Sequence, residues 1–186
     1  MKKMRGLEDL LLDTVKDIYY AEKKLLKAIP KMAKKADSSE LKEALQNHLE
    51  ETEGHVEKVE KIFKAMGTAP KGKKCHAIEG LIEEGEEVMA ENLEPAVRDA
   101  GIIVSAQKIE HYEIAAYGSI RTFAEILGFD DVADLAQEIL DEEGGADKTL
   151  NEIAMSINKE AAEGEEYHFG SKKAAKKPEW VMKGRE

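Results

Sequence analysis

The sequence predicts an all-α protein built as an antiparallel four-helix bundle. Of the 186 residues, 36% are charged, 5% are aromatic and only four are proline, a composition typical of helical proteins. Apolar residues recur at intervals of three and four over long stretches, which is the period of a helix that buries one face. A long connection with Pro70 and Gly72 then separates two pairs of these stretches.

The first pair of helices is expected at Leu7–Lys35 and at 37–66. In the first helix one apolar row repeats every seven residues: Leu11, Ile18, Leu25 and Met32. Asp37, with Glu40 three residues later, is expected to cap the second helix in the manner of a capping box. Gly67 follows it and supplies the left-handed conformation that commonly ends a helix.

Residues 68–74 are expected to form a loop, followed by a short helix at about 75–92. Pro95 suits the first position of a fourth helix, Pro95–Leu127, which Gly128 ends. Two neighbouring rows of this helix are expected to face inward, one with Val104 and His111 and one with Ile103, Glu110 and Tyr117. Asp130 or Asp131 is expected to cap the last helix, which reaches about residue 162.

Two long helices, a long connection with its own short helix, and two more long helices form the ferritin-like arrangement of a four-helix bundle. We therefore expect a ferritin-like bundle over residues 1–165, with the short helix in the crossover between helices two and three. An up-down five-helix bundle without a crossover is the alternative. Residues 171–186 carry a net charge of +4 and lack an apolar period, which predicts a basic flexible tail over 166–186.

The composition excludes several classes of protein. The net charge of −11 argues against a general nucleic-acid binder. No apolar run approaches the ~18 residues of a membrane span, and the charged N-terminus lacks the apolar region of a secretory signal. A single cysteine suits a reducing compartment. We expect a cytoplasmic protein that binds neither membranes nor specific nucleic acid.

The apolar rows are interrupted by acids and histidines near the middle of each long helix. Because antiparallel packing brings helix centres to one level, these side chains are expected to converge as metal ligands. The set is Glu22, His48, Glu51, His55, Glu110, Glu113 and Glu143. His48 is alternatively an outer partner of a ligand, and Glu142 is the alternative to Glu143.

Burying a lone carboxylate costs several kcal/mol, whereas a cluster of acids and histidines is stable around a multivalent cation. Di-metal carboxylate bundles take glutamates from all four helices and histidines from two, and such ligands suit Fe and Mn. We therefore expect two Fe or Mn ions as cofactors. The Glu-x-x-His spacing of those bundles is missing from the second and the last helix, and no histidine lies near Glu142 and Glu143. In the alternative interpretation, the acids pair with Lys and Arg on partly exposed faces.

Other residues near this level each allow two interpretations. The hydroxyls of Tyr112 and Tyr117 bind a ligand carboxylate, or they point to the surface. Gly144 and Gly145 permit a bulge or a close approach within the last helix, or they only weaken it. Cys75 is an activated thiol beside several lysines, or a buried or spare cysteine.

Several phrases of the sequence resemble the YciE/YciF family of ferritin-like bacterial proteins. They occur in order over about residues 5–160: LEDLLLDTVKDIYYAEKKLLKAIPKMAK, NHLEETEGHVEKVEKIF, PKGKKCHAIEGLIEEGEE and QKIEHYEIAAYGSIRTFAEILG. The resemblance implies a ferritin-like bundle, a homodimer, a di-metal centre and an association with stress responses. The pair Glu110-x-x-Glu113 resembles the rubrerythrin pattern on the equivalent helix.

The functional hypothesis is a di-metal protein that handles iron, O2 or peroxide in stress, with an oxidoreductase activity of the peroxidase, ferroxidase or catalase kind left open. The alternative is a helical interaction or stress protein without a metal site.

Overall fold

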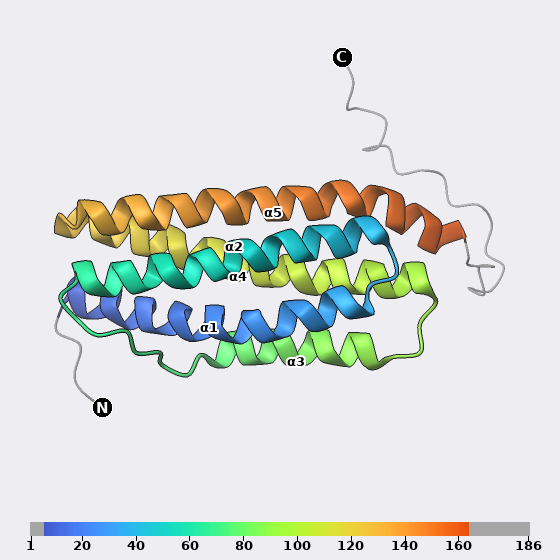
Figure 1. Ribbon diagram of the computed structural model, residues 1–186, viewed down its shortest axis with the longest axis horizontal. Helices are drawn as coiled ribbons and strands as arrows, with labels where there is room; N and C mark the ends of the chain where they lie inside the picture. The colour runs from blue at the N-terminus through green and yellow to red at the C-terminus, as the bar shows by residue number, and fades with distance from the viewer. Residues whose placement is uncertain (1–5, 164–186) are drawn as a thin grey trace, which may run out of the picture.

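The computed structural model describes residues 6–163, which contain five α-helices and no strand. Helices α1 (Leu7–Lys35) and α2 (Ser39–Ala65) form one hairpin, and α4 (Pro95–Leu127) and α5 (Asp130–Glu163) form another. The short α3 (His76–Ala90) lies in the connection between them (Figure 1). The predicted all-α class is therefore confirmed. The predicted tail, 166–186, lies outside the described residues.

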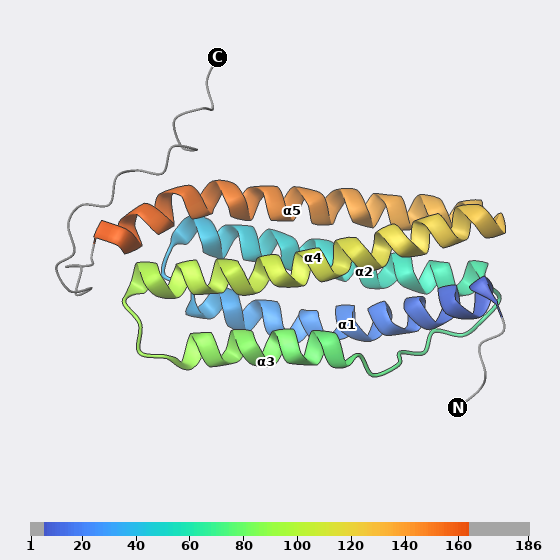
Figure 2. The same ribbon diagram turned by 180° about the vertical axis from the view of Figure 1, so that it is seen from behind.

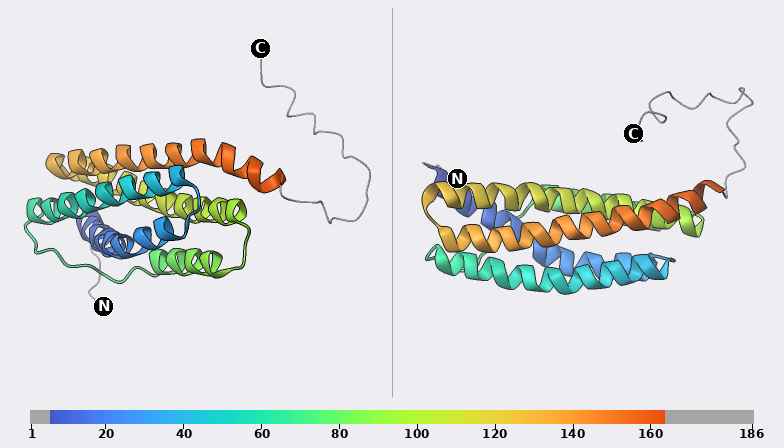
Figure 3. Two further views of the ribbon diagram at one scale, coloured as in Figure 1. Left: turned by 45° about the vertical axis from the view of Figure 1, so that its right-hand side comes forward. Right: turned by 90° about the horizontal axis from the view of Figure 1, so that it is seen from above.

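The four long helices form a ring in which each runs antiparallel to its two neighbours. α1 packs against α2 and α4, and α5 packs against the same two helices (Figures 1 and 2). The crossover returns along the bundle, and α3 lies outside the ring against α1 and α4 (Figure 3). This is the predicted ferritin-like bundle with a helix in its crossover, and the five-helix alternative is wrong.

The core consists of the apolar rows of the four long helices. The predicted row of α1 is buried along its whole length, from Leu11 to Met32. In α4 only one of the two predicted rows faces inward: Ile103, Glu110 and Tyr117 are buried, whereas Val104 is 53% exposed and the side chain of His111 is 67% exposed. α4 packs against α1, α3 and α5, and the strip with Val104 and His111 is the side that these helices leave to solvent.

The helix ends follow the predicted signals except at the starts of α2 and α5. α5 begins at Asp130, and the carbonyl of Phe129 accepts its first backbone hydrogen bonds, so neither Asp130 nor Asp131 is the predicted cap. Ser38, and not Asp37, caps α2, because its hydroxyl accepts a hydrogen bond from the backbone N–H of Leu41. Asp37 instead pairs with Arg98 of α4 at 2.9 Å. The predicted glycines at the ends of α2 and α4 both adopt the left-handed conformation, with φ of +67° at Gly67 and +75° at Gly128.

Candidate metal centre

Six of the seven predicted ligands are buried inside the bundle, where all four long helices contribute. Glu22 comes from α1, His48 and His55 from α2, Glu110 and Glu113 from α4, and Glu143 from α5. Each of these side chains interrupts an apolar row near the middle of its helix, so packing of the rows carries it inward. The seventh, Glu51, lies at the surface with a side chain that is 42% exposed.

The buried ligand atoms form two groups that share one residue. The first group holds His48, Glu110, Glu113 and Glu143, and the second holds Glu22, His55 and Glu143. In each group the atoms lie within 4.8 Å of one another, so small side-chain shifts bring them around one ion. Because Glu143 belongs to both groups, its carboxylate can bridge two neighbouring ions.

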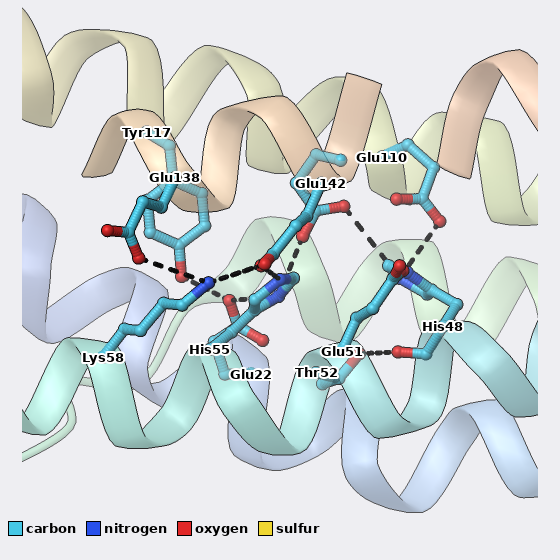
Figure 4. Close-up of polar contacts among 11 residues, drawn as sticks. Glu22, His48, Glu51, Thr52, His55, Lys58, Glu110, Tyr117, Glu138 and Glu142 are labelled. Atoms are coloured by element: carbon cyan, nitrogen blue, oxygen red, sulfur yellow. Dashed lines mark hydrogen bonds and ion pairs between the residues drawn. The ribbon is translucent and has the colours of Figure 1, made fainter. Parts of the chain in front are cut away.

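Each histidine has a carboxylate on its outer side. Nδ1 of His48 lies 3.3 Å from Glu51, and its Nε2 lies 3.3 Å from Glu110 in the interior. His55 has the reverse orientation: its Nε2 lies 2.9 Å from Glu142, and its Nδ1 faces the interior (Figure 4). When the outer nitrogen donates its proton to the outer acid, the inner nitrogen keeps its lone pair for a metal.

Glu142 and Glu143 are adjacent in the sequence but have different environments. Glu143 is fully buried, whereas Glu142 is at the edge of the bundle, where both its oxygens lie 2.7 Å from Nζ of Lys58 (Figure 4). Sequence reasoning missed Lys58. The sequence signal that could have identified Lys58 is its position three residues after His55, because residues three apart are neighbours on the surface of a helix. Lys58 holds the acid that orients His55.

The interior atoms of the cluster lack hydrogen-bond partners. They are Oε2 of Glu22, Nδ1 of His55, Oε2 of Glu110, and both carboxylate oxygens of Glu113 and Glu143. Nδ1 of His55 approaches Glu143 to 3.1 Å without hydrogen-bond geometry. Unpartnered buried polar atoms are costly, and the four carboxylates together carry four negative charges when ionised. Two divalent ions balance that charge, and the mixed oxygen and nitrogen donors fit Fe or Mn.

The ionisation of the cluster reflects this crowding. Burial and neighbouring acids, Glu143 foremost, hold the pKa of Glu110 and of Glu113 well above the usual range. Burial acts in the same direction on Glu143, but the neighbouring Glu110 and the two histidines lower its pKa. Burial lowers the pKa of His55, yet Glu143 and Glu22 raise it to about 10. The metal-free cluster therefore binds protons where a metal would otherwise supply positive charge.

Tyr112 and Tyr117 contact different partners, and these contacts distinguish between the interpretations of both residues. Tyr117 is fully buried and its hydroxyl donates a hydrogen bond to Glu22 (Figure 4). The hydroxyl of Tyr112 instead donates to Asp17 at 2.9 Å and lies 3.3 Å from the thiol of Cys75. Cys75 is buried at the start of α3, which supports the structural interpretation of this residue. Tyr117 is thus the tyrosine that positions a candidate ligand.

Gly144 and Gly145 lie beside the cluster within an unbroken α5. A Cβ atom added at either glycine meets nothing within 4 Å. Of the two interpretations of these glycines, the bulge or close approach is therefore wrong, and open space lies next to them.

A family model described as a domain of unknown function, DUF892, matches residues 6–163. The chain belongs to this family. The matched range coincides with the described helices, so the DUF892 domain is the whole bundle together with its candidate metal centre. Among the residues 6–163, no helix is long and apolar enough to cross a membrane.

The DUF892 chain is similar to several known proteins. It is 41% identical to protein YciF of Escherichia coli K12 over 160 residues, which are 85% of this chain and 96% of YciF. The crystal structure of YciF, described as an E. coli stress protein, matches with a TM-score of 0.81 and 40% identity, covering 84% of this chain and 99% of YciF. YcfI of Rhodopseudomonas palustris, proposed to have a structural role, matches with a TM-score of 0.79 and 43% identity over 81% and 96% of the two chains.

Proposed function

We propose that this protein is a ferritin-like di-metal carboxylate protein that binds two Fe or Mn ions. The observation that carries the proposal is the pair of buried ligand groups joined at Glu143. The lack of hydrogen-bond partners at the interior oxygens supports it, because ionised carboxylates in a dry interior need a counter-charge.

The chain's own residues have distinct roles in this proposal. His48 with Glu110 and Glu113 would hold one ion, Glu22 with His55 would hold the other, and Glu143 would contribute to both sites. Tyr117 fixes the Glu22 carboxylate through its hydrogen bond. Glu51 and Glu142 orient the two histidine rings from outside. When bound, the ions supply one-electron steps for the oxidation or reduction of iron, O2 or peroxide.

The proposal also covers the cellular role, the oligomeric state and the location of the protein. The similarity to the stress protein YciF supports a role in a stress response. We infer a homodimer, as the family resemblance implies, and a cytoplasmic location, which the single cysteine favours. No step of a particular peroxidase, ferroxidase or catalase reaction is assigned, because the last helix carries Ala146 where the Glu-x-x-His pattern requires histidine.

Metal analysis of the purified protein tests the proposal. We expect about two Fe or Mn ions per chain, and added ions should raise the melting temperature. A ligand present at 100 times its dissociation constant adds about 2.7 kcal/mol to the free energy of unfolding. Metal-free protein whose melting temperature stays unchanged with Fe(II) and Mn(II) would support the rival function instead.

The rival function is that of a helical protein without a metal site, for which the structural role proposed for YcfI is the specific support. On that account Glu110 and Glu113, whose pKa values are raised, remain protonated and serve only as neutral hydrogen-bonding groups.

A further inference from the structure

A cavity lies between α2 and α5 and ends at the candidate metal centre. Its volume is about 260 Å³, and its lining includes His48 and Glu110, two ligands of the first group. The remaining walls are mostly small or apolar, with Leu45 on α2 and Leu150 on α5. The cavity therefore connects one side of the bundle surface with one half of the cluster.

The cavity exists because two residues with small side chains, Gly145 and Ala146, follow Glu143 on α5. Gly145 lines the cavity, and a side chain added there meets nothing within 4 Å of its Cβ. Ala146 also lines it and stands three residues after Glu143, where di-metal bundles carry histidine. The space that an imidazole ring fills in such bundles is thus open here.

The inner end of the cavity presents a group that lacks a partner. Glu110 is 2% exposed, and its Oε2 has no hydrogen bond. His48 lies beside it with Nε2 at 3.3 Å from the other carboxylate oxygen. Because His48 and Glu110 line the end of the cavity, an ion held by them would be within reach of a ligand in the cavity.

The size and charge of the cavity narrow the class of that ligand. Each water molecule takes roughly 30 Å³ in the liquid, so the cavity exceeds what O2 or H2O2 needs. The carboxylate of Glu51 in the wall repels an anion, and the bound ions at the inner end repel a cation. An uncharged ligand avoids both repulsions. Asn47 and Thr149 provide only neutral polar groups.

We propose that this cavity binds a small uncharged organic molecule, which presents an oxygen or nitrogen atom to the His48–Glu110 end of the centre. This inference rests on the proposed function, since the ion held by His48 and Glu110 is the ligand's attachment point. Gly145 and Ala146 determine the shape of the site.

Imidazole at a pH above its own pKa is a suitable neutral probe, and Co(II) is a suitable metal because its visible spectrum reports coordination. We expect imidazole to shift the Co(II) absorption of the loaded wild-type protein. Gly145→Leu fills the cavity and should weaken imidazole binding at least tenfold. Ala146→Val is a second variant that narrows the same space.

Gly144→Leu is the matched control. Gly144 is the preceding residue of the same helix, is equally free of neighbours within 4 Å, and does not line the cavity. This variant should bind imidazole as the wild type does, and all three variants should retain the wild-type Co(II) content. Acetate, a small anion, should bind at least tenfold more weakly than imidazole.

Each failure has a different meaning. Protein that binds no Co(II) contradicts the proposed function and this inference together. Co(II) binding without a spectral shift on adding imidazole contradicts only the inference. The inference is also contradicted if imidazole binding is weakened equally, or not at all, in the Gly144 and Gly145 variants. Acetate binding as tight as imidazole binding contradicts the assignment of an uncharged ligand.

Discussion

The carboxylate of Glu143 lies between the two buried histidines: its Oε1 is 3.1 Å from Nδ1 of His55, and its Oε2 is 3.9 Å from Nε2 of His48. The histidines stand seven residues apart on α2, so two turns of one helix face a single acid of α5. The two ligand groups are therefore joined and not independent, and the properties of one are expected to depend on the other.

Substituting this shared residue should impair both groups. Glu143→Gln keeps the side-chain volume but removes the bridging charge. Losing an outer partner of a metal ligand typically costs 10–100-fold in affinity, and loss of a shared ligand should cost more for both ions. Titration calorimetry with Mn(II) measures this. Glu152→Gln, an exposed acid on α5, should leave the affinity unchanged, and a Glu143→Gln variant that still binds two ions tightly would contradict the assignment.

Glu51 should act through His48. Because Glu51 is 42% exposed and contacts Nδ1 of that ring, Glu51→Ala should weaken metal binding about 10–100-fold without abolishing it. Glu53→Ala changes an exposed acid two residues away on α2 and should have no effect. Equal metal affinities of the two variants in the same titration would show that Glu51 does not orient the ring.

The hydrogen bond from Tyr117 to Glu22 should stabilise the metal-free protein. Tyr117→Phe preserves the ring and leaves one oxygen of a buried carboxylate without its donor, so it should lower the free energy of unfolding by about 1.5–3 kcal/mol, as for hydrogen bonds to charged groups. Urea denaturation measures the difference. Tyr20→Phe removes a partly buried hydroxyl that donates to Glu79 and should cost less. An unchanged midpoint for Tyr117→Phe would mean that this hydrogen bond contributes nothing to stability.

The metal-free and metal-bound proteins should respond oppositely to pH. The raised pKa of Glu110 and Glu113 means that the folded chain keeps protons that the unfolded chain loses above about 4.5. The free energy of unfolding of metal-free protein should therefore fall as the pH rises from about 5 to about 8. His55, with a pKa of about 10, acts in the same direction above 6.5, and the lowered pKa of Glu143 matters only at lower pH.

Metal uptake requires these acids to be deprotonated, so the stabilisation that Mn(II) adds should grow over the same pH range. Thermal unfolding with and without Mn(II) at several pH values measures both trends. Metal-free protein that becomes more stable as the pH rises would contradict the ionisation described for Glu110 and Glu113.

Much of the site was predictable because charge in an apolar row is a conspicuous break in a periodic pattern. Glu22, between Val15 and Ile29, and Glu110, between Ile103 and Tyr117, both follow from seven-residue spacing alone. Periodicity fails at the border of a helix face. Glu51 lies one position before the buried Thr52, and that offset of about 100° turns its carboxylate to the surface.

Other features depend on partners that lie far away in the sequence. α4 is apolar on two sides, and the packing of α1, α3 and α5 around it leaves Ile103 buried and Val104 exposed. Asp37 and Ser38 are both suitable caps for α2, and Arg98 and Asp99 of α4 determine the outcome by binding the turn before the helix. Such long-range contacts leave no local sequence signal.

Anomalous diffraction from crystals grown with Mn(II) tests the central claim most directly. The account predicts two peaks per chain, separated by the roughly 3.5–4 Å that is typical of two-metal sites, with the carboxylate of Glu143 between them. One peak should lie among His48, Glu110 and Glu113, and the other beside Glu22 and His55. A cluster without any peak, with its acids hydrogen-bonded only to one another, would contradict the assignment of a di-metal centre.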